Sequence, residues 1–131
     1  MGQGNIIGYE INEKTCQISY YNDQQMEPET LEVDSDNYQI PLIIGKLRDT
    51  WAYGKEAKRL VSIKEGFTVT RLLSRSLAGD KIEFGEETYD AVWLLSQFIQ
   101  MSLQPFPQID GIVFSVPTLT EELAQMLRGI A

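Results

Sequence analysis

The chain has 131 residues, enough for one domain with a sizeable core, and a formal net charge of −8. This acidic balance argues against non-specific nucleic-acid binding, which needs a basic face. The absence of histidine excludes a histidine-based catalytic triad or metal site within the chain. The single cysteine excludes an internal disulfide and favours a reducing compartment, and no apolar run is long enough to span a membrane. We therefore expect one cytoplasmic domain over residues 1–131.

The first clear pattern is a pair of alternating segments joined by a polar turn. Residues 7–11 and 16–20 each alternate apolar and polar side chains, which is typical of β-strands, and Asn12-Glu13-Lys14 lies between them. Asparagine tolerates left-handed backbone angles, so Asn12 suits the tip of a β-hairpin. Cys16 falls on the apolar side and is expected to be a small buried residue rather than a reactive thiol.

The next part of the chain predicts loops, short strands and a first helix. In chain order, we expect a loop at 22–30, a short strand at 31–33, a turn at 34–37, a β-rich segment at 38–44 whose Pro41 marks a strand start or an edge, a strand at 51–53 and a helix over 55–60.

The last part predicts three further helices and more strands. A helix is expected over 67–78, stopped by Gly79, followed by a strand pair at 81–84 and 87–89 and a long helix capped by Asp90. The apolar run at 109–116 predicts a strand covered on both faces. Thr118 and Glu121 have the spacing of a capping box for a final helix. This order predicts an α/β (or α+β) fold in which helices cover a sheet.

Three stretches of this sequence resemble the N-terminal lobe of the actin-like ATPase superfamily, which includes actin and the seventy-kilodalton heat-shock chaperones. The segment 7–12 (IGYEIN) is similar to the family's opening strand and phosphate turn. The segments 40–44 (IPLII) and 53–58 (YGKEAK) resemble a proline-led strand and the helix start that follows it. The segment 112–117 (IVFSVP) resembles the strand that ends in Val-Pro before the next helix.

The resemblance implies a ribonuclease-H-like mixed sheet with N-terminal antiparallel strands and helices on both faces. It implies ATP and Mg²⁺ as cofactors of the full-length protein, in a cleft between this lobe and a second one. The chain would then be an N-terminal lobe fragment, inactive alone, whose partner is the missing C-terminal part of the actin-like fold. Other proteins remain possible partners, whereas nucleic acid and membranes are not expected.

The resemblance also assigns roles to residues of the hairpin. Glu10 stands where the family has its catalytic, metal-binding aspartate, and Asn12, Glu13, Lys14 and Thr15 occupy the phosphate-binding turn. Asn12 replaces a glycine of that turn. Glu13 would oppose a triphosphate, because a carboxylate about 4 Å from a phosphate oxygen costs about 4 kcal/mol at an effective dielectric constant of about 20.

Two further groups of side chains could take part in function. Lys58 stands where the chaperones have a lysine that orients the attacking water, so it is a second catalytic candidate. Arg71 and Arg75 form a basic helix edge. The aromatic residues Trp51, Tyr53, Trp93 and Phe98 are expected in the core or at an interface rather than around a ligand.

Plainer interpretations remain open for each candidate. The charged residues of the turn can be solvated residues of a hairpin, Lys58 an ordinary surface lysine, and the two arginines a solvated face. Two functions therefore compete: a subdomain of an actin-like, chaperone-like ATPase, and a nucleotide-independent protein-interaction module on a degenerate actin-like fold. The family assignment also predicts that Glu10 and Asn12 lie beside the end of the strand at 112–116.

Overall fold

The computed structural model describes residues 5–21, 29–30, 39–106, 108–117 and 120–130. In these ranges the chain forms a mixed α/β fold with the following elements: β1 (Asn5–Ile11), β2 (Thr15–Tyr21), β3 (Glu29–Thr30), β4 (Gln39–Pro41), β5 (Ile44–Leu47), β6 (Thr50–Tyr53), α1 (Lys55–Ile63), β7 (Phe67–Val69), α2 (Leu72–Leu77), β8 (Lys81–Phe84), β9 (Glu87–Asp90), α3 (Ala91–Ser102), β10 (Ile109–Ser115) and α4 (Glu121–Ile130). None of these helices combines the length and apolarity needed to cross a bilayer.

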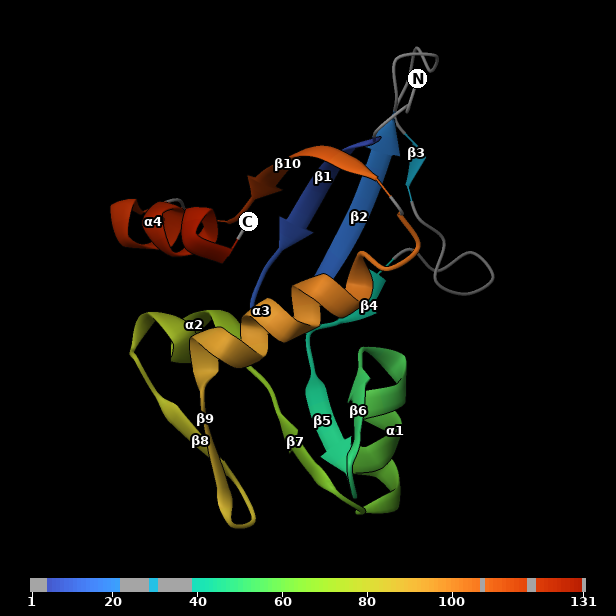
Figure 1. Cartoon of the computed structure of the whole chain (residues 1–131), viewed down its shortest axis with the longest axis vertical. Helices are drawn as coiled ribbons and strands as arrows, with labels where there is room; N and C mark the ends of the chain where they lie inside the picture. The colour runs from blue at the N-terminus through green and yellow to red at the C-terminus, as the bar shows by residue number, and fades with distance from the viewer. Residues whose placement is uncertain (1–4, 22–28, 31–38, 107, 118–119, 131) are drawn as a thin grey trace.

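The largest sheet is built on the predicted hairpin, which the structure confirms (Figure 1). β1 and β2 pair antiparallel, with Ile11 opposite Cys16, and β3 and β4 both pair with the far edge of β2. On its other side β1 pairs in parallel with β10, which lies about one hundred residues later in the chain, so that Tyr9 is opposite Phe114. The strand order is β10-β1-β2-β3, with β4 beside β2.

The remaining strands form two smaller sheets at the other end of the molecule. β5 lies between β6 and β7, and α1 packs on this three-stranded sheet, while β8 and β9 form a separate hairpin (Figure 1). Rings from both sheets and from α3 (Ala91–Ser102) meet around Trp51, whose centroid lies 5.3 Å from that of Tyr89 in β9 and 5.8 Å from that of Trp93 in α3. As expected, Phe98 is a core residue and Trp51 and Tyr53 are half-buried, whereas Trp93 remains 42% exposed.

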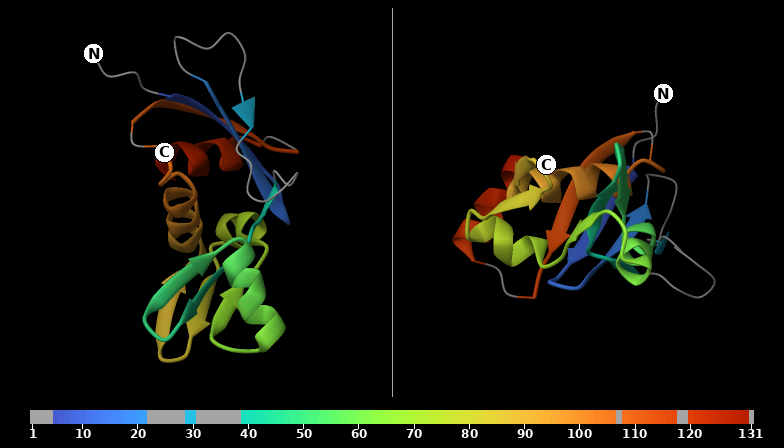
Figure 2. Two further views of the ribbon diagram at one scale, coloured as in Figure 1. Left: turned by 90° about the vertical axis from the view of Figure 1, so that its right-hand side faces the viewer. Right: turned by 90° about the horizontal axis from the view of Figure 1, so that it is seen from below.

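The helices that pack on the large sheet lie on one of its faces, not on both as we expected. The left view of Figure 2 shows α2, α3 and α4 below the sheet. This is the face that carries the buried side chains of Ile7 and Tyr9. On the opposite face β1 carries the half-buried Ile6, Gly8 and the exposed Glu10, and Val113 of β10 is 63% exposed. The prediction that the strand at 109–116 is covered on both faces is therefore wrong for this face.

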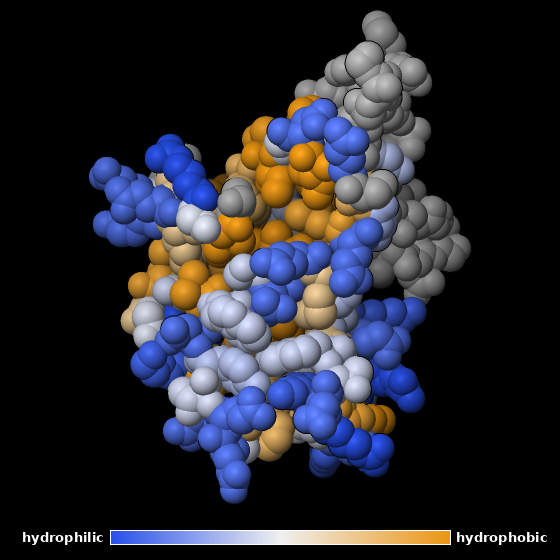
Figure 3. Space-filling model, in the orientation of Figure 1, coloured by the Kyte–Doolittle hydropathy of each residue, from blue (hydrophilic) through white to orange (hydrophobic). Residues whose placement is uncertain are grey.

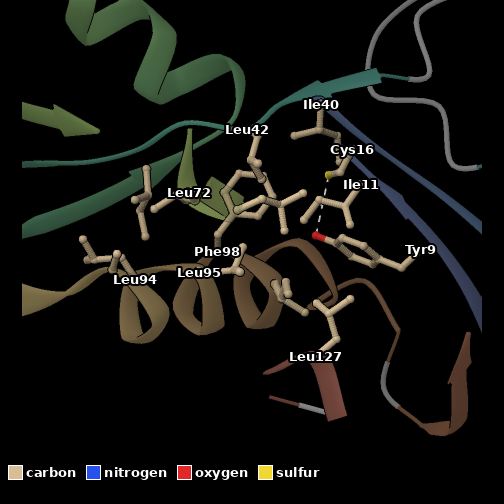
Figure 4. Packing of buried hydrophobic residues seen from close by; sticks show 14 of the residues in the cluster. Tyr9, Ile11, Cys16, Ile40, Leu42, Leu72, Leu94, Leu95, Phe98 and Leu127 are labelled. Carbon is tan, nitrogen blue, oxygen red and sulfur yellow. Dashed lines mark hydrogen bonds between the residues drawn. The ribbon is translucent and has the colours of Figure 1, made fainter. Parts of the chain in front are cut away.

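The core lies between the sheet and these helices. Side chains from β1, β2, β4, the link from β4 to β5, α2, α3 and α4 converge there, among them Tyr9, Ile11, Cys16, Ile40, Leu42, Leu72, Leu94, Leu95, Phe98 and Leu127 (Figure 4). The apolar stripe predicted for the long helix is buried as far as Ile99, and its last member, Met101, is half-buried. Burial of this stripe holds α3 against the sheet, because removing apolar surface from water is the main driving force of folding.

The largest error in the predicted secondary structure is the helix expected over 67–78. Residues Phe67–Val69 form strand β7, because Val69 pairs with Ile44 of β5, and the helix covers only Leu72–Leu77. Arg71 has a left-handed backbone (φ 58°) that separates the strand from the helix. The apolar spacing was misleading because Val69 of β7 and Leu72 and Leu73 of α2 are buried in the same core.

Smaller differences concern the ends of elements. Glu29–Thr30 is a strand rather than part of a loop. Pro41 ends β4 rather than beginning it, and the alternative that Pro41 marks an edge is confirmed, because β2 is the one strand with which β4 pairs in the described ranges. Gly79 does follow α2 with φ +71°, as predicted. The side chain that caps α4 is Thr120, whose Oγ1 accepts a hydrogen bond from the Leu123 backbone N–H at 3.1 Å. The predicted cap Thr118, the strand at 31–33 and the turn at 34–37 lie outside the described residues.

Candidate functional site

The hairpin turn between β1 and β2 is closed by the side chain of Asn12. Its Oδ1 atom accepts hydrogen bonds from the backbone N–H groups of Lys14 and Thr15, both at 2.8 Å. The Asn12 N–H donates to the Thr15 carbonyl at 2.9 Å. Asparagine often closes turns in this way, because its side chain reaches the backbone two or three residues on. The amides of Lys14 and Thr15 are therefore already engaged and do not point at a ligand.

Glu13 projects from the same turn onto the start of α2. Its Oε1 accepts a hydrogen bond from the Ser74 backbone N–H at 2.9 Å. Its Oε2 is enclosed, makes no hydrogen bond and lies 3.9 Å from Nε of Arg71. The first backbone N–H groups of a helix lack partners within it, and a carboxylate is favoured there. Glu13 thus caps α2 from a distant part of the chain, and it ties the turn to the body of the domain.

A small polar hollow lies on one side of the turn. It has a volume of about 260 Å³ and is lined by Glu10, Ile11, Asn12, Ser115, Val116 and Pro117. The parallel pairing of β1 with β10 creates it, because Glu10 is the register partner of Ser115. The prediction that Glu10 and Asn12 lie beside the end of the strand at 112–116 is confirmed. In open α/β sheets, ligands commonly bind beyond the carboxyl ends of parallel strands.

A second hollow, of about 400 Å³, lies on the other side of the turn. Its apolar floor is Leu42 and Ile43, and its rim carries Thr70, the two cations Lys14 and Arg71, and Glu13. The Arg71 side chain is 75% exposed, so its pairing with Glu13 contributes little to stability. The basic edge expected at Arg71 and Arg75 is indeed a solvated face, since Arg75 is also 44% exposed and pairs with Asp80.

Behind the turn, a chain of buried hydrogen bonds supports the end of β1. The Cys16 thiol donates to the Tyr9 phenol at 3.6 Å, and the Tyr9 phenol lies 2.6 Å from Ser102 Oγ, which donates to the Ile99 carbonyl at 2.8 Å. Because Ser102 uses its only proton on Ile99, Tyr9 is the donor in the bond to Ser102. Burial raises the pKa of the Cys16 thiol to about 12 and the pKa of Tyr9 well above its usual value. Cys16 is therefore the small buried residue that we expected.

The structure brings together some of the predicted site residues and leaves one apart. Glu10 and Asn12 line the polar hollow, Glu13 and Lys14 line the second one, and Thr15 takes part in closing the turn. Lys58 is exposed on α1, which packs on the three-stranded sheet, and it lines neither hollow. Glu10 and Lys58 are therefore not parts of one pocket.

The residues around the turn do not fit the group that the resemblance implies. Two amides of the turn are used by Asn12, and the Glu13 carboxylate lies where a phosphate would need a cation. Within the described ranges, no three Asp, Glu, Cys or His side chains gather closely enough to hold a metal ion. Glu10 is the one described carboxylate that lines the polar hollow, so Mg²⁺ bound there would take its remaining oxygen ligands from water and phosphate. No step of nucleotide chemistry follows from this arrangement.

Sequence reasoning missed the part of the site that comes from α2 and from the residues just before it. Ser74 and Thr70 are ordinary polar residues in sequence, and nothing in their spacing indicates that they lie beside the turn. The one signal in the sequence was Glu13 itself. A carboxylate repels phosphate, so its presence in the turn indicates that Glu13 contacts a hydrogen-bond donor of the protein rather than a phosphate group. Ser115, by contrast, lies at the end of the strand at 112–116, beside which Glu10 and Asn12 were predicted to lie.

Comparisons with known proteins add a family but no activity. No curated protein matches this chain significantly. A family model does match residues 27–131, that is, everything from β3 onward, and leaves out the hairpin. Its description is the C-terminal region of a family of unknown function, DUF5716. Since the match covers well over half of the chain, the protein belongs to this family of unknown function, DUF5716.

Proposed function

We propose that this chain is a protein-interaction module that keeps an actin-like, ribonuclease-H-like frame and works without nucleotide. The frame is supported by the strand order, in which an antiparallel ribbon (β1, β2 and β3) carries β10 in parallel on its first strand. It is also supported by the helices that cover one face of this sheet. Function must nevertheless be argued from the site, because one fold hosts many activities.

The observation that carries the loss of nucleotide binding is the double hydrogen bond to Asn12 Oδ1. A phosphate turn needs backbone N–H groups that are free to point at oxygen atoms. Here the N–H groups of Lys14 and Thr15 both donate to Asn12. An incoming phosphate would have to replace these two bonds, each of which contributes about 1 kcal/mol.

The Glu13 carboxylate further disfavours phosphate binding by electrostatic repulsion. This carboxylate is held at the turn by the Ser74 N–H, so it cannot swing away without uncapping α2. At about 4 Å from a phosphate oxygen, the repulsion costs about 4 kcal/mol at an effective dielectric constant of about 20. These two terms together correspond to a loss of several orders of magnitude in affinity.

Isothermal titration of the chain with ATP and Mg²⁺ tests the proposal. We expect no binding tighter than millimolar, and therefore little or no rise in melting temperature at about 0.1 mM nucleotide. The Asn12→Gly/Glu13→Ser double variant frees the amides and removes the repulsion, and Lys14→Ala is a matched control on the same turn. Micromolar binding by the unmodified chain would overturn the proposal, and tighter binding by the double variant alone would support it.

A second candidate function, a nucleotide-binding subdomain of an actin-like ATPase, has one specific observation in its favour. Glu10, Asn12 and Ser115 share the polar hollow at the carboxyl ends of two parallel strands. Amide NMR spectra recorded during titration with Mg²⁺ and ADP test it. Saturable shifts at these three residues that disappear in Glu10→Gln would favour the ATPase subdomain. Unchanged spectra at millimolar nucleotide would exclude this hollow as the nucleotide site.

A further inference from the structure

Strand β10 (Ile109–Ser115) is an edge of the largest sheet. It pairs with β1 on one side, and no other strand in the described ranges pairs with its other side. An edge strand presents a row of unpaired N–H and C=O groups, which can extend the sheet with a strand from another chain. At seven residues, β10 is somewhat longer than a typical strand of about 5–6 residues.

The side chains of β10 leave apolar surface open on both faces of this edge. On the face without helices, Val113 is 63% exposed, the highest value among the large apolar residues that the structure describes. On the helix face, Ile112 and Phe114 are only half-buried. Figure 3 shows an apolar area over β1 and β10, between α3 and α4. An apolar area at a sheet edge is typical of an interaction surface.

The charge distribution favours a second copy of the chain at this edge. The whole chain carries a net charge of −8, which opposes association between copies over most of the surface. Between Ile109 and Pro117, however, Asp110 is the only charged residue. Two copies can therefore meet along β10 without bringing like charges together.

We propose that β10 pairs antiparallel with β10 of a second copy, across a two-fold axis at Val113. In this register Val113 faces the partner's Val113, Ile112 faces the partner's Phe114, and Gly111 faces the partner's Ser115. Directly opposite residues point to the same face of the sheet, so the half-buried Ile112 and Phe114 cover each other. Asp110 falls near the end of the pairing, whereas an axis at Ile112 would place it against the partner's Phe114.

This inference gives the proposed interaction module its partner, and to that extent it rests on the proposed function. The two can still fail separately. Binding of ATP in the titration above would overturn nucleotide independence and leave the pairing of β10 intact. A chain that stays monomeric would overturn the pairing and leave nucleotide independence intact.

Sedimentation equilibrium of the full chain from about 1 to about 300 μM tests the pairing, since an interface of this kind is expected to bind in the micromolar range. Val113→Asp places two carboxylates at the axis and should raise the dimer dissociation constant at least tenfold. Val61→Asp is the matched control, because Val61 is 50% exposed on α1, away from β10, and should change the constant less than twofold. Circular dichroism checks that both variants fold.

Cysteine cross-linking tests the register independently of affinity. Opposite Cβ atoms in an antiparallel pair are about 4.5–5.5 Å apart, close to the spacing of a disulfide. Under mild oxidation Val113→Cys should give a disulfide-linked dimer, whereas Val61→Cys should not, and the buried Cys16 does not interfere. A monomer at every concentration, or equal cross-linking of the two variants, would overturn the proposal.

Discussion

The phenol of Tyr9 lies 2.6 Å from the hydroxyl of Ser102, and this hydrogen bond joins β1 to the end of α3 across 93 residues of sequence. Both side chains are buried. The bond holds the strand that leads into the hairpin turn against α3, which contributes Ala91, Leu94, Leu95, Phe98 and Ile99 to the core. Each group in the chain from Cys16 to Ile99 donates one hydrogen bond to the next.

Removing the Tyr9 hydroxyl should destabilise the fold without changing it. Tyr9→Phe leaves the Cys16 thiol without its acceptor and Ser102 without its donor, so we expect a loss of about 1–2 kcal/mol in the free energy of unfolding. Urea denaturation measures this loss. In a double-mutant cycle with Ser102→Ala, a coupling energy near zero would show that the bond contributes nothing.

The turn should depend on the side-chain oxygen of Asn12 rather than on its amide nitrogen. Asn12→Ala removes the acceptor for the amides of Lys14 and Thr15 and should cost about 1 kcal/mol, whereas Asn12→Asp keeps the acceptor and should cost much less. Chemical denaturation of both variants gives the comparison. Equal losses in the two would contradict this account of the turn.

Glu13 should stabilise α2 by capping it. Glu13→Ala removes the acceptor for the Ser74 N–H, and we expect a loss of about 0.5–2 kcal/mol and faster hydrogen exchange at that amide. Glu13→Gln keeps an acceptor without the charge and should lie between Glu13→Ala and the unmodified chain. Lys14→Ala, a change of an exposed neighbour, is the control and should leave the exchange at Ser74 unchanged.

Stability should fall in alkaline solution because of Cys16. Its pKa is about 12 in the folded chain against 9.0 for an ordinary thiol, owing to burial. Above pH 9 the unfolded chain therefore loses this proton while the folded chain keeps it, so the free energy of unfolding decreases as the pH rises toward 12.

Thermal unfolding between pH 8 and 11 measures the effect, with Cys16→Ala as the control. That variant should lose part of the alkaline decrease, while Tyr9, whose pKa is also raised by burial, continues to contribute above pH 10. An identical pH dependence in the two proteins would contradict the assignment to Cys16. The native thiol should also resist modification by thiol reagents below pH 9.

The aromatic contacts of Trp51 should hold the β8–β9 hairpin against the three-stranded sheet. Trp51 contacts Phe84 and Tyr89 of the hairpin, with ring centroids 6.1 and 5.3 Å apart. A two-stranded hairpin is marginally stable by itself, so Trp51→Leu should cost about 2 kcal/mol and speed amide exchange in β8 and β9. Val92→Ala, at an exposed position, is the control. Unchanged exchange in β8 and β9 would show that other contacts hold this hairpin.

The sequence by itself determined the elements whose pattern is local. The hairpin of β1 and β2 alternates with a period of two residues around a turn that Asn12 suits, and α3 carries apolar residues at helical spacing over several turns. In both, neighbouring residues alone define which face is apolar. The position of Glu10 beside the end of the strand at 112–116 was predicted from the resemblance to the actin-like superfamily, and the pairing of Glu10 with Ser115 agrees with it.

Only the tertiary structure decided what depends on contacts between distant residues. Phe67–Val69 is a strand because β5 offers it a partner, and Val113 is exposed because no described helix lies on that face of the sheet. Glu13 caps α2 across 61 residues, which turns a residue predicted at a phosphate site into a structural one. Spacing along the chain specifies which side chains share a face, but the partner that covers this face comes from packing of the whole domain.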